Sequence, residues 1–393
     1  MQTLHPPIST QKPLRVLIVG AGIAGLTLAA LLKQRGIHPE VVEKLPKEEY
    51  NRTGYMIGLM PLGARVLNAL DLHELYRSNS VEVRRYSMYD GQAKQLNDFD
   101  TTSIFEFGSY QGISRPRLID VLLSGCDAPR FDTTVVALKE SSDEVRVTFS
   151  DGRTQEFDVV VIADGIHSPT RELAFGTHNH AYRQTGWAGW AWFTDMPATL
   201  AHSYREYWAA HGFLGLYIVE DDKVGVFVGG PMKRLKKKGP AGIAREFKAI
   251  LDKSDLNGDQ LLKPLVDDPD LYFWNFHDCR SQKWTTNRVA LLGDAADGFL
   301  PTAGIGASMA MDSAAALNDE LSRADPDHVD FALRLYENRQ KHRVELAQKN
   351  SRTLGSLMFF NNSAIAWLRN QVLKHYTINM FLKDIRKVME GKG

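Results

Sequence analysis

The stretch LRVLIVGAGIAGLTLAALLKQRGIHPEVVE, residues 14–43, decides the fold. It begins with an almost continuous apolar run, 14–19, which is typical of a strand buried on both faces of a parallel sheet. Glycines follow at once, and residues 23–35 then read as a helix that ends at Gly36. Residues 38–43 predict a second strand that ends on an acid. The stretch therefore predicts a β-α-β unit at the start of an α/β domain.

The three glycines have the spacing GxGxxG, and the strand, helix and terminal acid that this fingerprint needs are all present. Gly20 suits a tight turn, Gly22 lets a pyrophosphate approach the backbone, and Gly25 lets the helix pack closely on the strand. The helix N-terminus offers unpaired N–H groups to phosphates, and Glu43 can accept hydrogen bonds from ribose hydroxyls. The sequence therefore predicts a dinucleotide site, but the fingerprint does not say which dinucleotide binds.

Two later segments repeat the pattern of a buried strand followed by a small acidic turn. Residues 157–163 run into DGIHSPTR, and residues 288–292 run into GDAADGFLPTAGIGASMA at 293–310. The side chains of this last stretch are so small that it supplies little core. Such a stretch either packs against other backbone or lies against something that is not protein.

The middle and the end of the chain differ from the first part in composition and in the pattern of apolar residues. Residues from about 175 to 283 are rich in aromatic side chains and alternate in short runs, which favours antiparallel strands that form one wall of a cavity. The basic run 233–238, which precedes Gly239-Pro240, is interpreted as a solvated loop. From about residue 331 the chain reads as helical. Within it, the apolar segment 357–374 is expected to pack along the nucleotide-binding domain, with peripheral membrane contact as the alternative.

Composition narrows the classes of function. The chain of 393 residues has 47 basic and 47 acidic side chains, so charge gives no argument for a nucleic-acid partner. Cys126 and Cys279 do not have the spacing of a metal site, and no metal is expected. The first twelve residues lack a charged-then-apolar leader, and no apolar run reaches about eighteen residues. These features predict a cytoplasmic protein, either a monomer or a homodimer.

The three motifs, GAGIAG with Glu43, ADGIHSPTR and RVALLGDAADGFLPTAGIGAS, together resemble the single-component FAD-dependent aromatic hydroxylases. This para-hydroxybenzoate hydroxylase class includes the tetracycline-inactivating monooxygenase and the alkylquinolone hydroxylases. The resemblance implies an α/β fold in which a Rossmann-like FAD-binding domain is joined to a β-sheet substrate domain and C-terminal helices. The implied ranges are 12–75, 112–172 and 285–345 for the FAD-binding domain, 76–111 and 173–284 for the substrate domain, and 346–393 for the C-terminal helices.

The resemblance also implies a set of cofactor residues. They are Gly20, Gly22, Ala24, Gly25, Glu43, Lys44, Arg115, Asp164, Gly165, Gly293, Asp294, Pro301, Gly304, Gly306, Ala307 and Ser308. In this scheme the first glycines hold the pyrophosphate, Glu43 holds the adenosine ribose and Asp294 binds a ribityl hydroxyl. Residues 301–308 pass along the isoalloxazine ring, and Arg171 fits the second fingerprint.

Two positions depart from the family pattern. The family commonly has His where this chain has Asp297, and GQG where this chain has Gly304-Ile305-Gly306. An acid beside the flavin would alter its redox potential or the docking of the nicotinamide nucleotide. The preferred interpretation is that Asp297 points to solvent.

The resemblance implies that NADH or NADPH reduces FAD, that dioxygen forms a flavin C4a-hydroperoxide, and that oxygen is transferred to an aromatic or other electron-rich apolar small molecule. No side chain is assigned as catalytic. Candidates for the substrate wall are Trp190, Trp192, Tyr207, Trp208, His211 and Tyr217.

Three alternatives stay open. A flavin-dependent halogenase shares the fold, and Trp190-Ala-Trp192 is similar to part of its WxWxIP motif, although Phe193-Thr194 replaces Ile-Pro. A flavin reductase or dehydrogenase would use the same cofactor without inserting oxygen. A nucleotide-binding redox sensor would bind the cofactor without turnover.

Overall fold

Four parallel strands form the centre of the nucleotide-binding part, and their order fixes where the ligand-binding edge lies. In the computed structural model, which describes residues 13–51, 54–359 and 362–375, these strands are ordered β17-β11-β1-β2. Their bounds are Val16–Val19 for β1, Glu40–Val42 for β2, Val159–Ile162 for β11 and Val289–Leu291 for β17. Because parallel strands end at the same edge of a sheet, the turns that follow β1, β11 and β17 meet there.

Helix α1 (Ile23–Gln34) packs between α8 (Gly306–Leu321) and α4 (Arg115–Ser124). Its residues from Ala24 to Leu32 are all buried, which explains why this helix is apolar on every face. The predicted β-α-β start is confirmed. A separate antiparallel sheet and the short helix that packs on it complete this part: β8 (Val135–Glu140), β9 (Val145–Phe149), β10 (Thr154–Phe157) and α5 (Pro169–Phe175).

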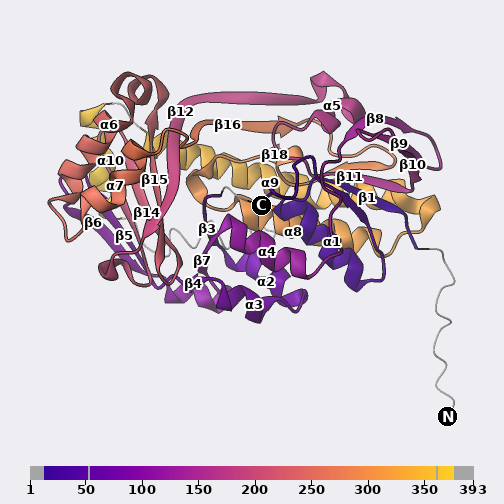
Figure 1. The fold of residues 1–393 in the computed structure, drawn as a ribbon, viewed down its shortest axis with the longest axis horizontal. Coiled ribbons are helices and arrows are strands. Elements are labelled where there is room, and N and C mark those ends of the chain that lie inside the picture. Colours follow the sequence, from indigo (N-terminus) through magenta and orange to yellow (C-terminus); the bar gives the residue numbers. More distant parts are fainter. Residues whose placement is uncertain (1–12, 52–53, 360–361, 376–393) are drawn as a thin grey trace, which may run out of the picture.

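An eight-stranded sheet forms the other end of the molecule (Figure 1). Its strands pair antiparallel, except that β13 and β5 are parallel. In spatial order they are β18 (Asp297–Gly298), β16 (Phe273–Ser281), β12 (His180–Asp195), β15 (Lys223–Pro231), β14 (Phe213–Glu220), β13 (Ser203–Trp208), β5 (Arg85–Asp90) and β6 (Gln95–Asp100). The expected antiparallel aromatic-rich strands are present.

Two helices inside this region differ from the expectation. Residues 233–238 belong to helix α6 (Met232–Leu251), not to a loop. Met, Lys, Arg and Leu are good helix formers, and Gly239, with φ of 66°, only interrupts the helix before Pro240 restarts it. Helices α6 and α7 (Gly258–Asp267) pack against β12.

Smaller elements join the two parts. A three-stranded sheet has the order β3-β7-β4, and helices α2 and α3 follow β3. Their bounds, with those of the 3-10 helices, are β3 Met56–Leu59, β4 Val81–Glu82, β7 Gln111–Ser114, α2 Pro61–Ala69, α3 His73–Ser78, η1 Thr102–Phe107, η2 Thr177–Asn179, η3 Ala198–Leu200, η4 Gly293–Ala295, η5 Pro301–Ala303 and η6 Pro326–His328.

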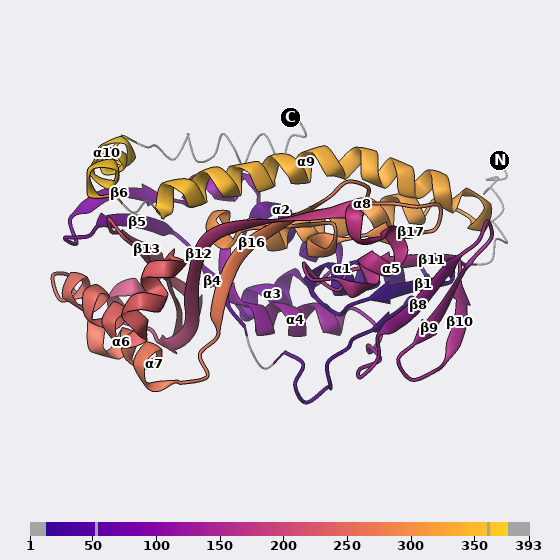
Figure 2. The ribbon, with the colours of Figure 1, turned by 90° about the horizontal axis from the view of Figure 1, so that it is seen from above.

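The two ends are connected by long elements. Strands β12 and β16 and helix α9 (Val329–Met358) all run lengthwise between them (Figure 2). The implied boundary between residues 345 and 346 falls inside α9, which continues without a break. None of the described helices combines the length and the apolar character needed to cross a bilayer.

Helix α10 (Ser363–Leu373) packs on the eight-stranded sheet, not along the nucleotide-binding domain as expected. Asn97 Nδ2 of β6 donates to the Leu373 carbonyl at 2.7 Å, and Arg369 donates to the Trp208 carbonyl at 2.8 Å. Trp367 and other apolar side chains of α10 are exposed, so membrane contact stays a prediction. Residues 376–393 of the predicted C-terminal helices lie outside the described residues.

Candidate active site

The glycine turn between β1 and α1 contains two glycines that pack against protein and one that faces open space. A Cβ on Gly20, which has φ of +106°, would lie 2.5 Å from the Ala163 carbonyl oxygen. A Cβ on Gly25 would lie 2.1 Å from the Gly20 oxygen. Gly22, in contrast, has no atom within 4 Å of the position of a Cβ, and its backbone lines a cavity of about 650 Å³. The turn therefore holds strand and helix together while it leaves one backbone segment uncovered.

Glu43 lies at the end of β2, beside this cavity. Its two carboxylate oxygens accept from the Ala21 and Leu45 amides, each at 3.0 Å. Because each carboxylate oxygen has a second lone pair, Glu43 can still accept from a ligand hydroxyl. Lys44 and Arg115 line the same cavity, and the Arg115 guanidinium makes no hydrogen bond or ion pair with a described residue.

The turn after β11 brings a second acid to the cavity. Asp164 Oδ1 is buried without a hydrogen-bond partner among the described residues, and burial raises the pKa of this carboxyl group. Gly165 follows with φ of +88° and nothing within 4 Å of its Cβ position. Arg171 is fully buried and donates to the Ala295 carbonyl at 2.8 Å and the Ile166 carbonyl at 2.9 Å. Arg171 therefore ties this turn to the turn after β17 and does not face the cavity.

The turn after β17 lines an adjoining cavity of about 280 Å³. Asp294 is exposed to this cavity and makes no hydrogen bond or ion pair with a described residue, and desolvation by the surrounding protein raises its pKa to about 6. Gly304, with φ of +61°, is also open at its Cβ position. The other implied residues that line this cavity are Gly22, Ala24, Arg115, Gly165, Pro301, Gly306 and Ala307.

Two implied residues lie behind the cavity. Ser308 is fully buried, and its hydroxyl accepts from the Met60 amide at 3.1 Å, which ties α8 to the start of α2. A Cβ on Gly293 would lie 2.7 Å from the Ala24 Cβ, so Gly293 permits close packing on α1. Both positions support the site through packing.

These cavities suit FAD. An uncovered glycine backbone at the start of α1 fits a pyrophosphate, and the exposed carboxylate of Asp294 can accept from a ligand hydroxyl. Gly304, which is open at its Cβ position, and Gly306, which also lines the cavity, leave room for a flat ring system against the backbone. The residues present therefore fit the cofactor that the motifs imply.

A third cavity of about 140 Å³ lies beside the flavin site, and the two share Tyr55, Pro301 and Gly304. Of the six side chains expected in the substrate wall, Tyr217 lines this cavity. Other residues of its wall were not among the candidates, and they include Tyr86, Tyr110, Ala191, Tyr204, Glu206, Phe213 and Phe227.

Four of the other candidates are buried in the core and differ from the expectation. Trp190 and Trp192 flank Ala191, so they point to the face of β12 covered by helices, and Trp192 Nε1 donates to the Leu261 carbonyl at 3.0 Å. Tyr207 stacks on Tyr89, and Trp208 packs behind the cavity. His211 also lies outside the lining residues, and its Nε2 is 3.4 Å from Ser363 Oγ of α10.

Asp297 does not point to solvent, so that expectation is wrong. Asp297 is 1% exposed, and its backbone pairs with that of Arg280 at the edge of the large sheet. Asp297 Oδ1 accepts from the Ser281 amide at 2.9 Å, and Arg280 Nε lies 4.0 Å from Oδ2. Burial raises the pKa of Asp297 to about 7, although the Ser281 amide and Arg280 both favour the charged form.

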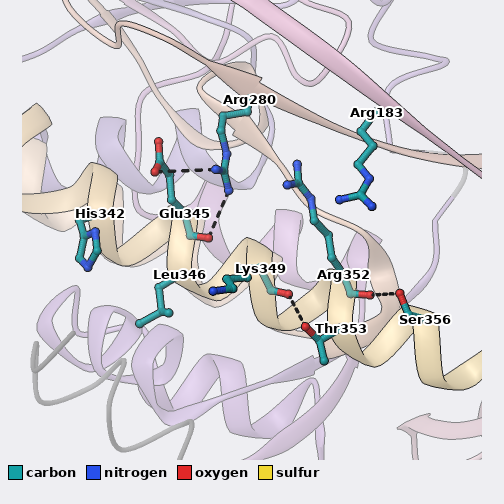
Figure 3. Close-up of a pocket in the computed structure, with 9 residues that line it drawn as sticks. All are labelled: Arg183, Arg280, His342, Glu345, Leu346, Lys349, Arg352, Thr353 and Ser356. Atoms are coloured by element: carbon teal, nitrogen blue, oxygen red, sulfur yellow. Dashed lines mark hydrogen bonds and ion pairs between the residues drawn. The ribbon is translucent and has the colours of Figure 1, made fainter.

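Arg280 separates Asp297 from an open, basic groove. Figure 3 shows Arg280 of β16 facing Glu345 of α9 across this groove, with Arg183 and Arg352 further along it. Arg280 donates to the Gln348 side chain at 2.8 Å and lies 3.9 Å from the Glu345 carboxylate. Asp297 therefore shares its cation with two other acceptors, which limits the stabilisation of its charge.

The fold and the cavities define a flavoprotein with the architecture of the FAD-dependent hydroxylases. Sequence comparison indicates the same class of protein. Residues 13–351 match the family described as FAD binding domain, and the chain belongs to this family. It is similar to 2-heptyl-3-hydroxy-4(1H)-quinolone synthase of Pseudomonas aeruginosa, with 27% identity over 91% of this chain and 93% of the relative. It is also similar to the FAD-dependent urate hydroxylase of Klebsiella oxytoca, with 27% identity over 84% of this chain and 87% of that enzyme.

Solved structures show the same fold. The chain superposes on Klebsiella pneumoniae HpxO in complex with FAD and uric acid, with a TM-score of 0.83 at 22% identity, over 96% of this chain and 97% of that one. Tetracycline destructase Tet(55) gives a TM-score of 0.72 at 24% identity, over 96% and 97% of the two chains. With the family match, these comparisons identify the chain as an FAD-dependent monooxygenase.

The two contrasting glycines of the first turn give a matched test. Gly22→Ser keeps a favourable N-cap residue and places its side chain in open space, so the stability of the apoprotein should change by less than about 1 kcal/mol. FAD affinity should fall at least about tenfold, because the side chain displaces a phosphate from the backbone amides. Gly25→Ser should instead destabilise the apoprotein by about 1–3 kcal/mol through overpacking. Urea unfolding and FAD titration measure both effects, and unchanged FAD affinity in Gly22→Ser would contradict the assigned cradle.

Asp297 predicts a pH-dependent stability. The pKa of Asp297 is about 7 in the folded protein, whereas that of a carboxyl group in the unfolded chain is about 3.9. Ionisation of Asp297 therefore lowers the free energy of unfolding, and this loss is absent below about pH 4 and grows as the pH rises through 7. Asp297→Asn keeps an acceptor for Ser281 and carries no charge. Its free energy of unfolding should match that of the wild type near pH 4 and exceed it by about 2–4 kcal/mol near pH 8. The exposed Asp267→Asn is the control, and an advantage of Asp297→Asn that does not vary with pH would contradict this account.

Proposed function

We propose that this monooxygenase hydroxylates a small aromatic molecule, with NADH or NADPH as the reductant and dioxygen as the oxidant. The observation that carries the proposal is the aromatic cavity that meets the flavin site at Pro301 and Gly304. The quinolone synthase and urate hydroxylase relatives are named for aromatic heterocycles, which supports a substrate of this kind.

Bound FAD supplies the redox chemistry by accepting a hydride from the nicotinamide nucleotide and activating dioxygen. The protein's own residues position and shield the reacting groups. Asp294 and the uncovered backbone of the α1 turn hold the cofactor, and the small residues before α8 leave its ring accessible from the substrate cavity. Helix α8 begins at Gly306, and its first amides favour a negative charge beside them by about 0.3–2 kcal/mol.

Aromatic side chains exclude water from the other end of the cavity. Phe213 is fully buried and Phe227 is nearly so, and both pack against neighbouring rings of the large sheet. A dry cavity limits unproductive loss of the activated oxygen to water. The substrate wall is therefore assigned to the side chains that line this cavity, of which Tyr217 is the one expected from the sequence.

Turnover of the purified holoenzyme tests this function. In air, a suitable phenol or N-heterocycle should accelerate NADH or NADPH oxidation, consume dioxygen and give a product that carries one labelled oxygen atom from isotopic dioxygen. Mass spectrometry and an oxygen electrode provide the readouts, and comparing the two nucleotides at equal concentration identifies the reductant. Flavin reduction without an oxygenated product would instead support a reductase, and halide-dependent products would support a halogenase.

A further inference from the structure

The substrate cavity contains one buried carboxylate that the cofactor chemistry does not use. Glu206 lies in the middle of β13, is 3% exposed and lines the cavity beside the flavin site. The neighbouring Arg205 points to the opposite face, where it pairs with Asp255 at 2.6 Å. Glu206 therefore faces the cavity, whereas the cationic side chain of Arg205, its neighbour in the sequence, does not.

Donors surround Glu206, but they leave part of it free. Tyr217 donates to Oε1 at 2.8 Å, Trp208 Nε1 donates to Oε2 at 2.9 Å, and the Tyr86 hydroxyl also hydrogen-bonds the carboxyl group. Because an indole nitrogen can only donate, Oε2 must act as an acceptor. A carboxylate offers about four acceptor positions, so about one remains for a ligand.

The rest of the cavity adds no positive charge. None of the described residues that line it is Lys, Arg or His. The Tyr204 hydroxyl lines the same cavity, is buried and has no hydrogen-bond partner among the described residues. The cavity therefore presents an acidic acceptor and a free hydroxyl, and it has nothing that would neutralise an anionic ligand.

Building on the function proposed above, we propose that Glu206 makes this cavity selective for a single aromatic ring that carries an O–H or N–H donor and no carboxylate. A cavity of about 140 Å³ accommodates about one ring, since a cavity of roughly 150 Å³ holds benzene. Glu206 accepts the donor hydrogen, and the surrounding aromatic side chains cover the ring. A benzoate-type ring is excluded, because it would place a second carboxylate beside a buried one.

Hydrogen bonding to Glu206 also suits the oxygenation. A ring O–H or N–H that donates to a carboxylate leaves more electron density on the ring carbons. Burial raises the pKa of Glu206, and the hydrogen bonds from Tyr86, Tyr217 and Trp208 oppose this shift by favouring the carboxylate. The same contact therefore selects the substrate and favours oxygen transfer to it.

Binding to the oxidised holoenzyme tests the proposal without turnover. Three rings of similar size are titrated and followed by the flavin absorbance: para-cresol, para-methylanisole and para-toluate. In the wild type, para-cresol should bind at least about tenfold more tightly than para-methylanisole, the value of one hydrogen bond to a charged group, and para-toluate should bind most weakly.

Two variants isolate the charge of Glu206. In Glu206→Gln the preference for para-cresol over para-methylanisole should fall about tenfold, and para-toluate should gain affinity. Tyr217→Phe keeps the charge and frees one acceptor position, so para-cresol should remain preferred and para-toluate should remain excluded. Asp255→Asn, on the other face of β13, should leave all three affinities unchanged. Flavin content and thermal unfolding verify that each variant is folded.

Clear results would overturn the proposal. Selection by Glu206 fails if para-toluate binds to the wild type as tightly as para-cresol, or if Glu206→Gln leaves the ranking unchanged. If Glu206→Gln does not fold, equal binding of the three rings to Tyr217→Phe overturns it. Because these titrations use no reductant, the ranking can hold even if the protein proves not to hydroxylate, and hydroxylation of a benzoate would overturn the selectivity alone.

Discussion

The parallel pairing of β17, β11 and β1 is the constraint on which the rest of the site depends. It places the ends of three strands that are distant in sequence at one edge, so that Gly22, Asp164 and Asp294 border adjoining cavities. Arg171 reinforces this convergence by linking the second and third turns through two backbone carbonyls. A cofactor as long as FAD can then contact three motifs at once, although each motif alone supplies only a short turn.

The large sheet completes the site by extending from the substrate region back to the flavin region. Strands β12 and β16 are long enough to belong to both, and α9 runs beside them. On β12, Ala191 is the small residue between two buried tryptophans, so the cavity lies where the strand presents no bulk. The substrate cavity is thus formed by small residues facing the flavin and by tyrosines and phenylalanines on the neighbouring strands.

The features that the sequence predicted are those with local physical signals. A strand, a glycine turn and a helix follow one another within thirty residues, and the acids after the strands mark the edge of the sheet. The register of β12 and β13 lacked such a signal, because aromatic residues occupy both faces and alternation alone does not say which face is the cavity. The burial of Asp297 also depends on a distant strand, since its amide donor belongs to Ser281 of β16. Short-range patterns contain no information about such contacts.

Glu206 illustrates why an acid among aromatic residues is informative once its face is known. A buried carboxylate is costly unless donors compensate it, and three donors on separate residues are arranged around this one. A hydrophobic residue of similar size would fill the same space without this arrangement. The flavin side of the site contains Arg115, whereas the lining of the substrate cavity has no basic residue among those described. The cavities that suit the cofactor therefore combine basic and acidic side chains, whereas the described lining of the substrate cavity has an acid without a basic partner.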